Sequence, residues 1–372
     1  MKSPGSFWHR VTDGMELNEL WKQFQIDARS SYRLYSRDVD ATRTPETGKW
    51  RHFFHVAKQF FWAVIEKLTP ARRILLLAAL VFLFTNFGSS WRAPNGNVEE
   101  VEFGGAFWGG LLLLALLVLE IGDRVVMKRD LQIAKDIQTW LLPAGPPDVP
   151  GMKVAFATRP ANTVAGDYYD VFARPSSDAA GTTFLIAIAD VAGKSVPAAM
   201  LMATFQASLK TLARTPGSLA DLVARMNTYA CSNSQNGRRF TTALIAEYDP
   251  ASRRLTYVNA GHNPPMLRRR AGAVERLEAG GVPIGIVEGA AYEASTVTLE
   301  SGDWVVIFTD GVTEAENSRA DEYGEARLIA VVNTFATTTP EVMLGTIMQD
   351  LDAFVGAAPQ HDDVTLLLLK VD

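Results

Sequence analysis

The sequence predicts an α+β domain of layered sheets and helices at the C-terminal end of the chain, preceded by a hairpin of two transmembrane helices. Two long apolar runs between residues 74 and 119 predict the hairpin, and short apolar strands that alternate with helices after residue 150 predict the domain. The 372 residues allow both parts, and 48% hydrophobic with 21% charged residues excludes a disordered, collagen-like or coiled-coil chain.

Charge and cysteine content exclude several classes of protein. The formal net charge is −5, which gives no basic signature, so no nucleic-acid partner is expected. The single cysteine, Cys231, excludes an intramolecular disulfide framework and a cysteine-rich metal site. The five histidines are too scattered to form a histidine-rich site.

The two apolar runs predict transmembrane helices at 74–91 and 103–121. The first has no ionisable side chain in 18 residues, which spans roughly 27 Å as a helix. The second has 17 apolar or small residues before Glu120 and is hydrophobic all round rather than along one stripe. Both lie far from the N-terminus, so neither is a signal peptide. The alternative is a pair of buried helices in a globular core.

Charges around the runs predict their orientation. Basic residues at 72–73 and 124–129 flank the runs, whereas the loop at 92–102 is short and acidic. By the positive-inside rule the loop is external and both termini are cytoplasmic, which gives a multi-pass membrane protein with the lipid bilayer as a partner. Residues 1–71 form a cytoplasmic N-terminal segment, and 52–68 reads either as an amphipathic helix on the membrane or as a solvated helix packed on the rest of the protein.

A linker helix is predicted at 122–143, where Pro143 ends it. Ile133, Ile137, Trp140 and Leu141 fall at helical spacing on one face. Such a stripe either packs on the domain core or forms the interface of a homodimer that transmits a signal from the membrane. The C-terminal domain then occupies 144–372.

Strands joined by tight turns predict antiparallel sheet in this domain, with helices that cover one face. The expected strands are 154–158, 168–172, 183–191, 241–248, 254–259, 304–309 and 364–371. The expected helices are 197–213, 218–231, 325–335 and 341–354. Ser218 is a plausible N-cap for the second of them.

Aspartates lie at the ends of several of these strands. Asp167 precedes one strand, Asp190 and Asp310 end two others, and Asp362 with Asp363 precedes the last. A single aspartate beside a strand is usually a turn residue, but four such positions indicate an edge where carboxylates converge. Oxygen ligands without histidine or thiolate suit Mg²⁺ or Mn²⁺.

These motifs resemble the PPM-type (protein phosphatase 2C-like) serine/threonine phosphatases, specifically the bacterial SpoIIE/RsbU branch. The resemblance covers about 130–372 through eight blocks in the family's order. They are IQTWLLP at 137–143, PANTVAGDYYDVF at 160–172, IADVAGKSVPAAMLMA at 188–203, TTALIAEYD at 241–249, YVNAGHNPP at 257–265, GGVPIGI at 280–286, GDWVVIFTDGVTEAEN at 302–317 and HDDVTLLLL at 361–369.

The resemblance implies an α/β-β/α sandwich that hydrolyses phosphoserine or phosphothreonine with two Mn²⁺ or Mg²⁺ ions. Two such ions can activate a water for in-line attack on phosphorus, so no protein nucleophile is required. The implied substrate is a phosphorylated regulatory protein, typically an anti-sigma-factor antagonist of the STAS type.

The resemblance also implies the ligands. Asp190 would bridge the two ions with help from the backbone carbonyl of Val191. Asp167 would contribute to one ion, and Asp310 and Asp362 would complete the pair.

Several neighbouring residues carry two interpretations each. Asp363 matches the family's second Asp or Asn, and the resemblance implies that it orients its neighbours rather than binds metal. Asp170 is a weaker ligand candidate, and the favoured alternative is a solvated or hydrogen-bonding carboxylate. His262 is either a general acid for the leaving oxygen or a structural histidine. Lys194 is either a surface charge or a phosphate contact.

Small departures from the family pattern affect loops rather than ligands. Ser195 stands where the family has the last glycine of GKG, and Ala165 replaces the first glycine of GGD. An aspartyl-phosphate enzyme of the haloacid-dehalogenase type is excluded because Phe308 occupies the position of its nucleophile. The remaining alternative is a catalytically inactive, membrane-anchored phosphatase-like signalling scaffold.

Overall fold

The computed structural model describes residues 58, 61–62, 65–85, 89–91, 101–175, 181–233, 239–278 and 280–372. These residues belong to two compact units, 1–125 and 126–372, and each unit is considered by itself. Predictions for residues 1–57, for most of the amphipathic helix at 52–68 and for the loop at 92–100 lie outside the described residues.

The first unit contains two helices that pack against each other. Helix α4 (Pro70–Phe84) is followed by a two-stranded antiparallel ribbon, β1 (Ser89–Trp91) and β2 (Val101–Phe103), and then by the start of helix α5 (Gly105–Leu141).

Ion pairs and a close glycine contact hold α4 against α5. The Arg72 guanidinium on α4 lies 3.2 Å from the Glu120 carboxylate and 2.7 Å from that of Asp123 on α5. A side chain at Gly109 would put its Cβ 2.9 Å from the carbonyl oxygen of Ala79. The glycine therefore permits a close approach of the two helices, as small residues do at helix interfaces in membranes.

The prediction of one helix over 74–91 is wrong at its C-terminal end. Helix α4 ends at Phe84, where Thr85 turns to an extended conformation and its Oγ1 donates a hydrogen bond to the Val81 carbonyl. Ser89–Trp91 is a strand. The 15 residues of α4 reach only about 22 Å, less than the ~30 Å of a bilayer core.

Helix α5 is the longer of the two and continues through the predicted linker. It begins at Gly105, close to the predicted start at 103, and runs without a break to Leu141. Within the described part of the chain, α5 is the one helix that is long and apolar enough to cross a membrane.

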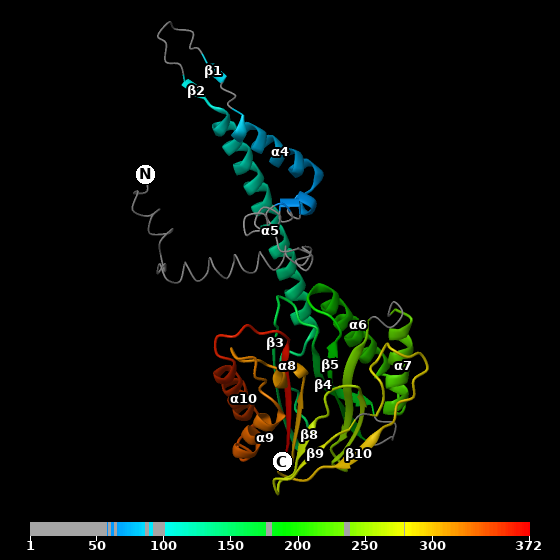
Figure 1. Ribbon diagram of the computed structural model, residues 1–372. Helices are drawn as coiled ribbons and strands as arrows, with labels where there is room; N and C mark the ends of the chain where they lie inside the picture. Colours follow the sequence, from blue (N-terminus) through cyan, green and yellow to red (C-terminus); the bar gives the residue numbers. More distant parts are fainter. Residues whose placement is uncertain are drawn as a thin grey trace, which may run out of the picture. The chain divides into compact units, whose positions relative to one another are not determined.

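The second unit is built on two antiparallel five-stranded sheets, shown in Figure 1. The first sheet has the order β10 (Ser295–Thr298), β7 (Arg254–Ala260), β6 (Thr241–Asp249), β5 (Thr182–Val191) and β4 (Tyr168–Pro175). The second has the order β3 (Met152–Arg159), β12 (Val364–Val371), β11 (Trp304–Phe308), β8 (Met266–Arg268) and β9 (Val274–Arg276). The predicted hairpin at 241–259 is confirmed as β6 and β7.

Helices cover the outer face of each sheet. Helices α6 (Val196–Leu212) and α7 (Leu219–Cys231) share a buried cluster with the first sheet. Helices α9 (Glu325–Thr334) and α10 (Pro340–Val355) share another with the second. Figure 1 shows the two pairs on opposite sides of the domain. The predicted four-layer α/β-β/α sandwich is therefore confirmed.

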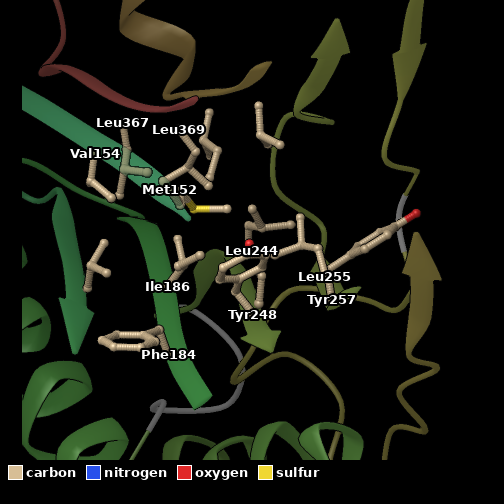
Figure 2. Close-up of a cluster of buried hydrophobic side chains, with 14 of the residues drawn as sticks. Met152, Val154, Phe184, Ile186, Leu244, Tyr248, Leu255, Tyr257, Leu367 and Leu369 are labelled. Atoms are coloured by element: carbon tan, nitrogen blue, oxygen red, sulfur yellow. The ribbon is translucent and has the colours of Figure 1, made fainter. Parts of the chain in front are cut away.

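The main core lies between the two sheets (Figure 2). Alternation along β5 explains how one strand serves two cores: Ile186 and Ile188 join the core between the sheets, whereas Leu185 and Ala187 pack beneath α6 and α7. A strand buried on both faces reads as a continuous apolar run, which is why β5 is recognisable from sequence.

Candidate active site

The two sheets bring the predicted aspartates to one edge. In the first sheet Tyr168 pairs with Ala189, so Asp167 before β4 lies beside Asp190 near the end of β5. In the second sheet Phe308 pairs with Leu366, so Asp310 lies on the side from which Asp362 leads into β12. Adjacent antiparallel strands start and end at the same edge, and each sheet thus contributes two aspartates.

Hydrogen bonds join the two sheet edges at this point. The Asp167 carboxylate, which is 2% exposed, accepts hydrogen bonds from the hydroxyl of Thr309 at 3.0 Å and from the hydroxyl of Thr365. The Asp363 carboxylate accepts from the backbone N–H groups of Ala161 at 2.7 Å and Gly166 at 2.6 Å. Asp363 thus holds the segment that carries Asp167.

The carboxylates influence one another's ionisation. Burial, followed by the charges of Asp310, Asp362 and Asp363, raises the pKa of Asp190 to about 7. Burial and the charge of Asp190 raise the pKa of Asp167 well above its usual range. Burial and the charge of Asp362 also raise the pKa of Asp310. The edge is therefore a concentration of negative charge that favours a cation.

The carbonyl of Val191 lies on the same side as the Asp190 carboxylate. A Cβ at Gly166 would lie 3.2 Å from the Val191 carbonyl oxygen and 3.9 Å from Oδ1 of Asp190. Both oxygens therefore face the glycine that precedes Asp167.

The structure places two further candidates, Asp170 and His262, in buried positions with partners of their own. Asp170 is 3% exposed, accepts a hydrogen bond from the Tyr168 hydroxyl at 2.8 Å and pairs with Lys210 at 2.7 Å. His262 is 5% exposed, with Nδ1 3.3 Å from the Thr242 hydroxyl, and burial lowers its pKa to about 4. His262 is therefore neutral at pH 7 and enclosed, which fits a structural histidine.

Three residues that the sequence analysis did not single out lie at or beside the edge. Thr309 and Thr365 hold Asp167, and their places directly before Asp310 and two residues after Asp363 were the available signal. Glu314 lies one helical turn after Asp310, and burial followed by the charges of Asp310, Glu322 and Asp362 raises its pKa.

A fourth missed residue ties the end of α5 to the Asp167 segment. Gln138, 6% exposed, donates through Nε2 to the Ala165 carbonyl at 2.7 Å, and its Oε1 accepts from the Ala165 N–H at 2.9 Å. This pair of bonds mimics a strand pairing with the backbone two residues before Asp167.

The donor set fits a hard divalent cation in its chemistry. It consists of carboxylate oxygens, and burial together with the neighbouring carboxylates raises the pKa values of Asp167, Asp190 and Asp310. No group of three or more Asp, Glu, His or Cys side chains in the described ranges is arranged to hold a metal ion as it stands. The Lys194 ammonium lies 2.9 Å from Oδ2 of Asp362 and so occupies one of the predicted ligands.

Comparison with known proteins gives the family. The model of the Stage II sporulation protein E (SpoIIE) family matches residues 180–372, more than half of the chain. The chain belongs to the SpoIIE family. The phosphoserine phosphatase RsbU of Bacillus subtilis is 29% identical over 252 residues, which are 67% of this chain and 72% of RsbU.

The chain matches only part of a longer relative. Protein IcfG of Synechocystis is 27% identical over 282 residues, which are 68% of this chain but 43% of IcfG. The chain therefore spans less than half of that relative's length.

Solved structures show the same fold as this SpoIIE-family domain. The SiaA-PP2C domain of Pseudomonas aeruginosa matches 67% of this chain and 99% of its own with a TM-score of 0.56 and 21% identity. The RsbU and RsbW domains of Rv1364c from Mycobacterium tuberculosis match 62% of this chain and 63% of theirs, with a TM-score of 0.52 and 22% identity. The sandwich thus has the PP2C-type fold.

Ser195 shows the physical consequence of this member's departure from the family's glycine. Its backbone has φ 65° and ψ −147°, a region that is essentially restricted to glycine. It is the N-cap residue of α6, but its side chain makes no capping hydrogen bond. The serine therefore carries backbone strain without a compensating bond.

We expect Ser195→Gly to stabilise the protein by about 1 kcal/mol, because relief of strain outweighs the added entropy of the unfolded chain. Thermal unfolding measures the change as a rise in Tm. Gly193, two residues before Ser195, has φ 121° with open space around its Cβ position. Gly193→Ala therefore tests backbone conformation alone and should lower Tm, because alanine is strained at this φ. A lower Tm for Ser195→Gly would contradict the strain.

Proposed function

We propose that the chain is a metal-dependent protein serine/threonine phosphatase. The observation that carries the proposal is the convergence of Asp167, Asp190, Asp310 and Asp362 from two sheets at one edge. Burial and the neighbouring carboxylates raise the pKa values of Asp190 and Asp310 there. Two Mn²⁺ or Mg²⁺ ions bound there would supply an activated water and offset the charge of the phosphate. Family membership supports the same activity.

Each residue of the edge has a role in this proposal. Asp190 and the Val191 carbonyl would hold both ions, and Asp167, Asp310 and Asp362 would complete the ligand set. Thr309 and Thr365 fix the Asp167 carboxylate by hydrogen bonds, so that it does not have to be ordered when metal binds.

The proposed substrate is a phosphoserine or phosphothreonine on a small regulatory protein, such as a STAS-type anti-sigma-factor antagonist. Two observations support it: RsbU is named a phosphoserine phosphatase, and the matched Rv1364c structure combines RsbU and RsbW domains. The proposed ligands would hold the ions, and the ions would meet only the phosphate, so contacts elsewhere on the protein surface would select the partner.

The protein is further proposed to lie in a bacterial inner membrane with its N-terminus and catalytic domain in the cytoplasm. Helix α5 supports one membrane crossing, and the close packing of α4 on α5 supports a hairpin. The exposed side chains of Ile133, Ile137 and Trp140 on α5 support a homodimer formed with a second copy of this helix.

Phosphate release from a phosphoserine STAS-domain protein tests the activity. The full-length chain in detergent should turn over with Mn²⁺ or Mg²⁺ and stop on addition of chelator. Asp310→Asn should abolish this turnover, whereas Asp249→Asn should not, because Asp249 ends β6 of the same fold at the opposite edge. Folded, metal-loaded protein without turnover would instead favour the scaffold function.

Control through the linker helix gives a separate prediction. Gln138→Leu removes both bonds to Ala165 and leaves a buried N–H and carbonyl unpaired, at a cost of about 1–3 kcal/mol. We expect amide hydrogen exchange over 165–167 to rise at least tenfold, as it follows from that loss. Gln132→Leu is the control, because Gln132 bonds only to Asp136 on an exposed face of the same helix. Equal exchange in both variants would contradict the coupling.

A further inference from the structure

The side chain of Lys194 bridges the two sheets at the candidate active site. It leaves the loop between β5 and α6, and its Nζ donates hydrogen bonds to Oδ2 of Asp362 at 2.9 Å and to the His361 carbonyl at 2.7 Å. Asp362 belongs to the segment before β12 in the other sheet. The lysine thus contacts a predicted metal ligand directly.

The charge of Lys194 also reaches other predicted ligands. It lowers the pKa values of both Asp190 and Asp310, against the rise caused by burial and by the neighbouring carboxylates. The nearby cations Arg159 and Lys210 are paired with Asp352 and Asp170 instead. Within the described residues, Lys194 is the basic side chain that faces the negative edge.

The pair between Lys194 and Asp362 is one that a metal ion can break. The lysine side chain is 56% exposed and the aspartate 47%, and exposed ion pairs are weak because water solvates the separated charges. A divalent ion offers Asp362 twice the charge at a shorter distance, so it displaces the ammonium.

We propose that Lys194 is an internal counter-cation, which holds Asp362 in the metal-free protein, has to release it before a divalent ion binds, and thereby weakens metal affinity. The inference rests on the proposed function, because it assumes that Asp362 is a metal ligand. It assigns to Lys194 a role in metal binding rather than a role as a phosphate contact or a surface charge.

The proposal predicts the direction of two changes. Without the ammonium, Asp362 is free to coordinate and the repulsion between lysine and metal is gone, so Mn²⁺ binds about tenfold more tightly. The metal-free protein becomes less stable, because its carboxylates lose their only facing cation in the described structure. Lys194→Arg keeps the charge and should therefore keep the weaker affinity.

Equilibrium binding of Mn²⁺ to the full-length chain in detergent, followed by the electron paramagnetic resonance of free Mn²⁺, tests the proposal. Lys194→Gln should lower the dissociation constant about tenfold relative to the unaltered protein and to Lys194→Arg. Lys153→Gln is a matched control, because Lys153 is 57% exposed and pairs with Asp372 away from this edge. Its affinity should equal that of the unaltered protein.

Three outcomes would overturn the proposal. Equal or weaker Mn²⁺ binding by Lys194→Gln, with normal binding by the unaltered protein, would overturn this inference and leave the proposed function intact. The same tightening in Lys153→Gln would reduce the effect to net charge and overturn it too. No Mn²⁺ binding by the folded, unaltered protein would overturn both the inference and the metal-dependent function.

Discussion

Asp190→Asn is expected to abolish metal-dependent phosphate release and, at the same time, to stabilise the metal-free protein. As the proposed shared ligand of both ions, Asp190 supports several kcal/mol of transition-state stabilisation, so turnover should fall by roughly 10³-fold or more. The stabilisation has a separate origin, since Asp190 faces Asp310, Asp362 and Asp363. Removing one negative charge relieves their repulsion.

The stability gain depends on pH in a direction fixed by the raised pKa. The folded protein holds a proton on Asp190 up to a pKa of about 7, whereas the pKa of a free aspartate is 3.8. The folded state therefore binds more protons between these values, and stability is lost as pH rises through 7. In the presence of chelator, the free energy of unfolding of Asp190→Asn should therefore rise by on the order of 2 kcal/mol relative to that of the unaltered protein as pH increases from 5 to 8.

Denaturant unfolding at the two pH values measures this difference directly. The lowered pKa of His262 makes stability rise with pH in the acid range, opposite to the effect of Asp190. Both proteins share this contribution, so it cancels in the comparison. With saturating Mn²⁺ the order should reverse, because only the unaltered protein gains full binding energy. A pH-independent difference in chelator would contradict the electrostatic description of the edge.

Gly311→Ala is expected to be the most disruptive single-methyl change at the site. A Cβ at this position would lie 2.0 Å from the backbone carbonyl oxygen of Asp363 and 2.9 Å from its carbonyl carbon. Neither atom is the end of a flexible side chain, so the backbone of the Asp362 segment must move away from Asp310. We expect a loss of about 3 kcal/mol or more in the free energy of unfolding and loss of Mn²⁺ binding.

Gly345→Ala provides the matched control. Gly345 lies inside α10, and nothing lies within 4 Å of its Cβ position. Alanine should therefore raise stability by about 0.5–1 kcal/mol through its helix propensity. Thermal unfolding and Mn²⁺ titration of both variants measure the contrast. Normal stability of Gly311→Ala would mean that Asp310 does not lie against the Asp362 segment as described.

The main strands and helices were predictable because local pattern determines them. Strand β5 is buried on both faces and reads as an unbroken apolar run, and Ser218 caps α7 by accepting a hydrogen bond from the Asp221 N–H as predicted. The three-residue strands β8 and β9 have too few residues for a period, and their existence depends on pairing with distant strands.

The end of α4 shows the limit of hydropathy. The apolar run continues past Phe84 to Trp91, but the helix ends where Thr85 adopts an extended backbone. Apolar content predicts that a segment avoids water, not that its backbone remains helical. The prediction for the second helix agrees better with the structure, because Gly105–Leu141 contains no internal break.

At the candidate site, the sequence predicted which carboxylates lie at strand ends but not what surrounds them. The bonds from Thr309 and Thr365 to Asp167, and from Gln138 to Ala165, join residues far apart in the chain. Likewise the contact of Lys194 with Asp362 crosses from one sheet to the other. Such contacts depend on how the two sheets and the end of α5 pack together, which no local pattern encodes.

The number of Mn²⁺ ions bound per chain, measured by equilibrium titration of the full-length protein, tests the central claim most directly. The proposed edge of four aspartates predicts two ions per chain in the unaltered protein and loss of both in Asp190→Asn, because Asp190 is their shared ligand. Unchanged binding in Asp190→Asn, or turnover of a phosphoserine protein without any bound divalent ion, would contradict it.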